Sequence, residues 1–416
     1  MSTAGPALSD TAAPARAQLR RALSLPLLTL YGLGVTVGAG IYVLIGATAA
    51  VAGPQAWVSF LLAACIVAFT AFSYAELSTR YPVSAGEAAY VEAGLGRRWI
   101  ATGVGLLVAL SGIVSASAVA IGAAGYIAGL TGFGQAGLVV AVVLSMGLVA
   151  WWGISQSVTV AAIITVVEIL GLVCVITWGF GVAERGGVAL ADLLPTADMA
   201  VWSGIAAASL LAVFAFIGFE DMVNVAEEVK DPTHAMPRAI FLTLIVATVL
   251  YVATCIAVLV SVPIAQLSGA AAPLMLVFAN APEVVRTSFA VVAIVATVNG
   301  VLIQMIMASR VLYGLADRGQ LPALLAQVSP RTRTPSVATG CVTLMILGFG
   351  LLLPIEALAG WTSQIVLGVF VLVNLALIRV KARARDAGTH FHTPLFVPIL
   401  GVVTSGLLLL SGFIAL

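Results

Sequence analysis

The chain has 416 residues, of which 62% are apolar and only 8% are Asp, Glu, Lys or Arg. A soluble domain is nearer half apolar and about one quarter charged, so this chain has too few polar side chains to cover a surface that faces water. Its net charge of +1 excludes a nucleic-acid partner attracted by bulk charge. The composition therefore indicates an integral membrane protein that is in contact with lipid.

Eleven apolar runs are long enough to cross the membrane as helices, which takes about 20 residues for about 30 Å of hydrocarbon. They lie at residues 27–51, 56–78, 99–127, 134–152, 156–181, 200–225, 238–262, 287–314, 336–353, 358–379 and 395–416. All but two of the 18 Lys and Arg, namely Arg185 and Arg286, then fall on one side of the membrane. Because Lys and Arg collect in cytoplasmic connections, we expect a multi-pass protein of the cell (plasma or inner) membrane with a cytoplasmic N-terminus.

The first run contains a cluster of glycines in the sequence GVTVGAGIY, at Gly34, Gly38 and Gly40. Each glycine costs a helix interior up to about 1 kcal/mol relative to alanine, so the cluster predicts an unwound stretch. Unwound backbone at membrane depth must line protein or water, because lipid offers it no hydrogen bonds. Close helix packing through small residues is the alternative interpretation.

The fifth run contains an isolated carboxylate, Glu168, in the sequence TVVEILGLV. An ionisable residue inside a membrane helix is a candidate functional residue. Burial favours the neutral form of a carboxyl group, so Glu168 is a candidate proton carrier. The alternative is that Glu168 stays protonated as a buried hydrogen-bond donor.

The sixth run contains FAFIGFED, in which a glycine is followed by the adjacent carboxylates Glu220 and Asp221. Such a pair in an apolar run indicates a break that water can reach, and repulsion between the two predicts that they lie on opposite sides of it. Runs one and six are five helices apart and cross the membrane in opposite directions. Interruptions at matching places in two inverted halves point to a transporter binding site at the midplane. Helix N-termini suit a carboxylate and freed carbonyls suit an ammonium group, which together fit an amino acid.

Four stretches carry a resemblance to the amino acid, polyamine and organocation permease superfamily, from about Pro26 to Arg385. They are GVTVGAGIY, YAELSTRYPVSAGEAAYVEAGLG, FAFIGFEDMVNVAEEVKDPTHAMPRAI and SRVLYGLADRGQLP, which begin at residues 34, 74, 214 and 309. The resemblance implies an all-α membrane protein with a leucine transporter-like core of two inverted five-helix repeats, in which helices 1 and 6 are broken. We expect a disordered cytoplasmic tail at 1–24, a transport core at 25–385 with repeats at about 27–181 and 200–379, and an accessory C-terminal helix at 386–416.

The resemblance also implies a substrate site that is built largely from backbone. The substrate-binding positions that it transfers are Gly38, Ala39, Gly40 and Ile41, around the carboxylate, and Phe214, Ala215, Ile217 and Gly218, around the amino group. Phe214 matches an aromatic gate over the substrate, although ordinary core packing also explains this side chain.

The driving ion is expected to be a proton. Glu220 matches an acidic residue that often follows this glycine in the superfamily, and it is a second candidate for proton coupling beside Glu168. In many sodium-independent members the position of Glu168 is a lysine, so the charge is reversed here. Sodium coupling in the superfamily draws on hydroxyls of the eighth span, where Thr297 has no neighbouring Ser or Thr, and a proton is therefore favoured over sodium.

The predicted function is secondary active transport of amino acids by alternating access, with proton symport. An amino acid or polyamine exchanger is the first alternative, and a channel or an intramembrane enzyme is a rival from another class. An enzyme would need a nucleophile with a base, or a metal set, at membrane depth, and the runs contain no HExxH, no GxSxG and no His with a carboxylate. We expect no cofactor and no metal. Glu76 and Arg80 are four apart and are predicted to form an ion pair on one helix.

Overall fold

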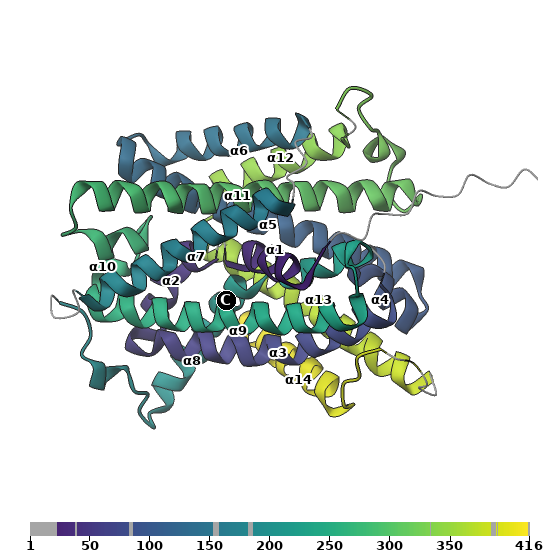
Figure 1. Ribbon diagram of the computed structural model, residues 1–416, viewed down its shortest axis with the longest axis horizontal. Helices are drawn as coiled ribbons and strands as arrows, with labels where there is room; N and C mark the ends of the chain where they lie inside the picture. The colour runs from purple at the N-terminus through teal and green to yellow at the C-terminus, as the bar shows by residue number, and fades with distance from the viewer. Residues whose placement is uncertain are drawn as a thin grey trace, which may run out of the picture.

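The computed structural model consists of α-helices that lie with their long axes in a common direction (Figure 1). It describes residues 23–37, 40–82, 86–152, 158–181, 186–332, 334–383, 388 and 390–414. Within these ranges, strand pairing is limited to an isolated parallel bridge between Leu23 and Val229. Most of the predicted tail, residues 1–22, lies outside the described residues. The predicted all-α class is confirmed.

Each of the eleven predicted runs contains a helix. In chain order they form α1 (Leu25–Val37) with α2 (Gly40–Ala52), α3 (Ala56–Arg80), α5 (Arg98–Thr131), α6 (Gln135–Trp152), α7 (Val158–Gly181), α8 (Met199–Phe216) with the 3-10 helix η4 (Glu220–Glu228), α9 (Pro232–Ser261), α11 (Glu283–Asp317), α12 (Ser336–Leu352), α13 (Ile355–Arg383) and α14 (Phe396–Ile414). Short helices in the connections are η1 (Gly53–Gln55), α4 (Gly86–Leu95), η3 (Leu190–Leu193), α10 (Ile264–Leu267), η5 (Pro273–Phe278) and η6 (Ala323–Ala326).

Eight helical stretches of the described chain are long and apolar enough to cross a membrane, one of them formed by α2, η1 and α3 together. Helices α1, α12 and α14 are shorter and apolar. Large apolar side chains are exposed on the outer helices, for example Leu148 on α6, Ile163 on α7 and Ile245 on α9. Hydrocarbon chains solvate such side chains as well as a protein interior does, so this surface fits a lipid environment.

The helix packing follows the inverted repeat. Helices five spans apart pack on one another: α2 on α8, α3 on α9, α5 on α11 and α6 on α12. The other main contacts occur in matching pairs, so that α1 on α9 corresponds to α8 on α3, and α5 on α13 corresponds to α11 on α7. Exchanging the two halves therefore reproduces the packing. The packing also brings the two interrupted spans together, since α1 and α2 of the first contact α8 of the second. Helix α14 packs outside this arrangement, on α13, α3 and α8.

Candidate functional site

The first membrane span is described as two helices, α1, which reaches Val37, and α2, which starts at Gly40; the place between them is called the first interruption below. Two predicted site residues in this gap, Gly38 and Ala39, lie outside the described residues. Gly40 and Ile41 are both buried in the first turn of α2. A Cβ atom on Gly40 would overlap the Cα atom of Ala215 in α8, so a glycine is needed for the two interrupted spans to approach this closely.

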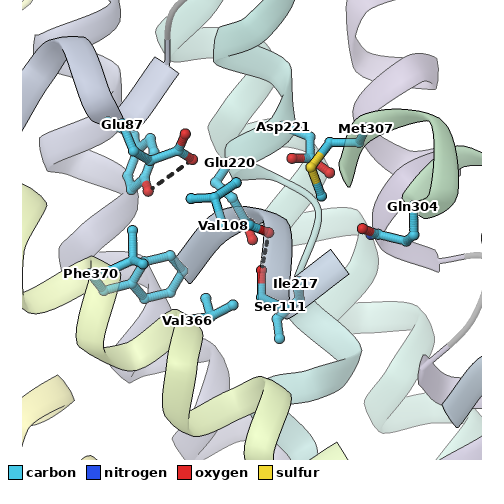
Figure 2. A pocket seen from close by; sticks show the side chains of 12 residues that line it. Glu87, Val108, Ser111, Ile217, Glu220, Asp221, Gln304, Met307, Val366 and Phe370 are labelled. Atoms are coloured by element: carbon cyan, nitrogen blue, oxygen red, sulfur yellow. Dashed lines mark hydrogen bonds between the residues drawn. The ribbon is translucent and has the colours of Figure 1, made fainter. Parts of the chain in front are cut away.

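The second interruption follows Phe216, the last residue of α8. Ile217 has extended backbone, Gly218 has a φ of 123°, and η4 then begins at Glu220. The amide of Gly218 donates a hydrogen bond of 2.9 Å to Oε2 of Glu220, whose side chain lies close to Ile217 (Figure 2). The prediction that Glu220 and Asp221 lie on opposite sides of the break is wrong, because the chain turns at Ile217 and Gly218 and both carboxylates belong to the half-helix that follows.

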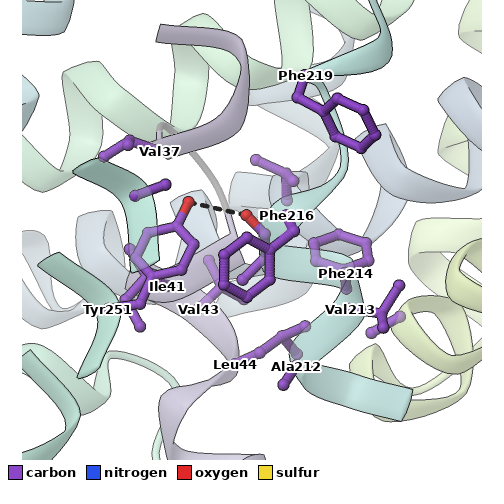
Figure 3. Packing of buried hydrophobic residues seen from close by; sticks show 14 of the residues in the cluster. Val37, Ile41, Val43, Leu44, Ala212, Val213, Phe214, Phe216, Phe219 and Tyr251 are labelled. Atoms are coloured by element: carbon purple, nitrogen blue, oxygen red, sulfur yellow. Dashed lines mark hydrogen bonds between the residues drawn. The ribbon is translucent and has the colours of Figure 1, made fainter. Parts of the chain in front are cut away.

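Tyr251 of α9 joins the two interruptions. Its hydroxyl lies 2.7 Å from the carbonyl oxygen of Thr36 in α1 and 2.8 Å from that of Ala215 in α8. The hydroxyl has one proton, so the two carbonyls share it. Phe216 packs edge-on against the Tyr251 ring, with centroids 5.1 Å apart (Figure 3). Sequence reasoning did not find this residue, although a single tyrosine in an otherwise apolar run is a signal that a buried hydroxyl has a partner.

A narrow cavity lies between the two interruptions. Its walls come from α1, α2, α5, α11 and the end of α8, and they consist of Gly34, Val35, Thr36, Gly40, Ser115, Phe214, Ile217, Gly300, Ile303 and Gln304. Three predicted site residues, Gly40, Phe214 and Ile217, thus meet at one cavity. Ile41, Ala215 and Gly218 are not part of its walls.

The carbonyl groups at the end of α8 are already partly used. The oxygen of Phe214 accepts a hydrogen bond of 3.3 Å from the amide of Ile217, and the oxygen of Ala215 accepts from Tyr251. A carbonyl oxygen has two lone pairs, so each of these groups is able to accept a second donor. The side chain of Phe214 is buried and forms part of the cavity wall, which is compatible with both the predicted gate and ordinary packing.

Glu168 lies near the middle of α7 and is fully buried. Neither carboxyl oxygen has a hydrogen-bond partner of normal geometry among the described residues, and the nearest polar side chain that acts on the carboxyl group is that of Asn299 in α11. The backbone carbonyl of Glu168 accepts a hydrogen bond of 2.7 Å from Tyr42 in α2. One turn earlier, Thr165 packs against Gly34 of α1. The helix that carries Glu168 therefore contacts both α1 and α2, and Glu168 itself is not part of the cavity wall.

The comparison with protein families decides the classification. A family model described as "Amino acid permease" matches residues 23–416. The chain belongs to the amino acid permease family. It is accordingly a multi-pass membrane protein, and the resemblance seen in the sequence is confirmed.

Several characterised relatives of this permease are transporters. The chain is similar to the branched-chain amino acid permease BcaP of Bacillus subtilis, with 30% identity over 92% of this chain and 85% of the relative. It is 29% identical to the methylthioribose transporter of the same organism, over 94% and 87% of the two chains. It is 31% identical to the vacuolar cationic amino acid transporter 2 of Arabidopsis thaliana, over 88% of this chain and 60% of the relative. The three names differ in substrate, so they support transport without choosing the molecule carried.

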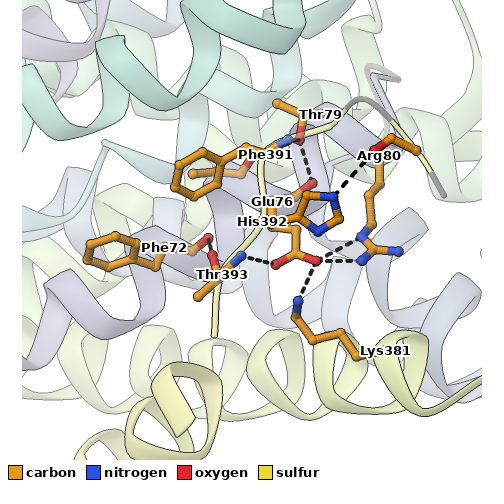
Figure 4. A network of polar contacts seen from close by, with 10 residues as sticks. Phe72, Glu76, Thr79, Arg80, Lys381, Phe391, His392 and Thr393 are labelled. Atoms are coloured by element: carbon orange, nitrogen blue, oxygen red, sulfur yellow. Dashed lines mark hydrogen bonds and ion pairs between the residues drawn. The ribbon is translucent and has the colours of Figure 1, made fainter. Parts of the chain in front are cut away.

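A polar network joins α3, α13 and the segment before α14 (Figure 4). Glu76 of α3 is fully buried and forms the predicted ion pair with Arg80, at 2.6 Å, and a second one with Lys381 of α13, at 2.8 Å. Its other oxygen accepts a hydrogen bond of 2.8 Å from the amide of Thr393, just before α14. His390 and His392 present ring nitrogens within 4.8 Å of a Glu76 oxygen. Two cations and an amide already use this carboxylate, so it is better suited to an ion-pair network than to binding a metal.

Proposed function

We propose that this permease is a secondary transporter that carries amino acids across the membrane by alternating access, in symport with protons. The observation that carries the proposal is the cavity at which the two interrupted spans meet, with Gly40 on one side and Phe214 and Ile217 on the other. Interrupted helices expose backbone amides and carbonyls, and at membrane depth such groups are found where they line protein or a water-filled site.

The two ends of an amino acid would be bound by the two interruptions. The N-terminus of α2, with the amides of Gly40 and Ile41 and those expected of Gly38 and Ala39, offers hydrogen-bond donors and the positive end of the helix dipole to a carboxylate. The carbonyls of Phe214, Ala215 and Ile217 would accept hydrogen bonds from the ammonium group, at the bend that Gly218 permits. Phe214 would cover the substrate from the wall of the cavity.

The coupling group in this proposal is Glu168. Its burial without a cation or a normal hydrogen bond, among the described residues, favours a neutral side chain in this conformation. The Tyr42 and Thr165 contacts link its helix to both sides of the first interruption. Movement of α1 and α2 would then change the access of water to Glu168 and allow the proton to leave. Glu220, beside the second interruption, is the second proton-coupling candidate.

Orientation and location follow from the distribution of cations. We propose that the permease lies in the plasma or inner membrane with its N-terminus in the cytoplasm, because nearly all Lys and Arg fall in connections on that side. The 1–24 tail, the 25–385 transport core and the 386–416 accessory segment remain the proposed division of the chain.

Uptake into proteoliposomes tests the function and its coupling together. We would measure accumulation of a labelled amino acid mixture with an imposed inward proton gradient, for the parent and for Glu168→Gln, with Glu356→Gln, an exposed carboxylate, as the control. Symport predicts that the gradient drives accumulation in the parent and in the control, while Glu168→Gln retains only exchange. If the gradient has no effect, and preloaded amino acid accelerates uptake in all three proteins, the permease is an exchanger and Glu168 is not the coupling group.

A further inference from the structure

A second cavity adjoins the first and is lined by three carboxylates. Ile217 and Gln304 belong to the walls of both cavities, so the two are neighbours. The carboxylates come from separate elements: Glu87 from α4, and Glu220 and Asp221 from η4. Figure 2 shows the three side chains around one space, with Gln304 at its edge. The remaining wall is mostly apolar and consists of Val108, Met307, Val366, Val369 and Phe370, with Tyr74 and Ser111.

The charges of this cavity have no counterpart in the described chain. Glu87, Glu220 and Asp221 are 4%, 7% and 6% exposed, and none of them forms an ion pair with a described residue. Glu87 accepts a hydrogen bond of 3.3 Å from the Tyr74 hydroxyl, and Glu220 accepts one from Gly218. The Asp221 side chain has no hydrogen bond to any described residue, although it is buried and lines the cavity.

Like the carboxyl group of Asp221, the side-chain amide of Gln304 is a buried polar group that lines the cavity. It is 7% exposed, lies where the two cavities meet, and has no hydrogen bond among the described residues. Buried polar groups are normally paired, and an unpaired group in a cavity wall indicates a missing partner. Burial also raises the pKa of the Glu87 carboxyl to about 7, so Glu87 changes charge readily near neutral pH when a cation arrives.

Three buried carboxylates around a cavity with apolar walls match an organic cation better than a purely protonated cluster. Protonation would remove the charge, but it would leave the Asp221 carboxyl and the Gln304 amide without partners. An ammonium group supplies three donors that converging carboxylate oxygens are able to accept. The apolar side chains suit the methylene chain that would connect such a group to the first cavity.

We propose that the second cavity binds the cationic end of the transported molecule, which is therefore a basic amino acid. The inference rests on the proposed function, because it takes the interruptions as the site of the α-carboxylate and α-amino groups. The side chain of the substrate would pass Ile217 and Gln304, and its terminal ammonium group would lie among Glu87, Glu220 and Asp221. When the substrate is bound, each of the three buried carboxylates would then have the ammonium group as a neighbouring cation.

The test compares L-lysine with L-norleucine, which has the same chain without the terminal ammonium group. Full-length permease in proteoliposomes would be assayed for uptake of each labelled compound, with the affinity ratio as the readout. We expect tighter binding of lysine by about tenfold or more, the scale of a hydrogen-bonded charge, and we expect Asp221→Asn to lower the lysine to norleucine ratio by a similar factor. Glu92→Gln, an exposed carboxylate on the same helix as Glu87, should leave the ratio unchanged.

The possible failures are distinguishable. Norleucine uptake equal to or better than lysine uptake in the parent overturns the inference and leaves the proposed function standing, and this comparison requires no variant to fold. A ratio that Asp221→Asn does not change also overturns it. Thermal stabilisation of the purified protein by sodium, lost in Asp221→Asn and without a preference for lysine, would make the cavity an inorganic cation site instead. If neither compound, nor any labelled amino acid, is transported, the proposed function fails as well.

Discussion

Tyr251 shows how one side chain holds two interrupted helices in register. Its hydroxyl is the hydrogen-bond donor for a carbonyl at the end of α1 and for another at the end of α8, which are groups that a continuous helix would satisfy by itself. Both carbonyls are in buried backbone, where an unsatisfied polar group is costly. The residue therefore stabilises the conformation in which the two interruptions face each other.

Removal of this hydroxyl by Tyr251→Phe should weaken that conformation. We expect a loss of stability of about 1 kcal/mol from the missing hydrogen bond and, if the whole of this energy enters the conformational transition, a change of about fivefold in uptake rate. Thermal unfolding in detergent and initial uptake rates would measure both effects. Tyr313→Phe is the matched control, since Tyr313 is half-buried on α11 and has no hydrogen bond among the described residues. Equal behaviour of the two variants would contradict the role of Tyr251.

At the scale of elements, the close approach of α2 and α8 depends on the absence of a side chain at Gly40. In Gly40→Ala the new methyl group would overlap Ala215, and overpacking of this kind costs about 1–3 kcal/mol. We expect a lower unfolding temperature and lower uptake. Gly348→Ala in α12 is the control, because a Cβ atom there meets open space and alanine favours the helix by up to about 1 kcal/mol. A Gly40→Ala protein as stable and active as the parent would show that the helices separate easily.

The sequence allowed the elements to be predicted better than their contacts. Apolar length located all eleven runs, because a helix in lipid must be long, apolar and internally hydrogen-bonded. The FAFIGFED motif located the second interruption to within a few residues, whereas the stretch predicted from the glycine cluster includes Gly38 and Ala39, which lie outside the described residues. In contrast, nothing local in the sequence indicates that Glu87, in a connection after α3, meets Glu220 and Asp221, or that Tyr251 reaches both interruptions. Such contacts depend on the packing of the two halves, and among the predicted site residues that the structure describes, Gly40, Phe214 and Ile217 line the first cavity.

At the scale of the whole molecule, the inverted packing gives the two halves equivalent contacts around the cavities. Exchange of the halves preserves which helices touch, and the proposed alternating access would use this equivalence to give its two conformations matching contacts. The accessory helix α14 and the Glu76 network break this equivalence, because α14 has no counterpart among the described helix contacts and the network joins one end of α3 to one end of α13. The network connects α3 of the first half, α13 of the second half and the segment before α14. It should therefore resist separation of the halves at that end.

Loss of the central charge tests this structural role. In Glu76→Gln, Arg80 and Lys381 would remain close together without their carboxylate, and breaking a buried ion pair costs about 3–5 kcal/mol. We expect a marked fall in the unfolding temperature of the detergent-solubilised protein. Glu283→Gln is the matched control, since Glu283 pairs with Arg286 at the surface, where an ion pair contributes about 1 kcal/mol or less. The important comparison is between these two variants: similar small effects would show that water reaches Glu76 and that the network does not hold the two halves together.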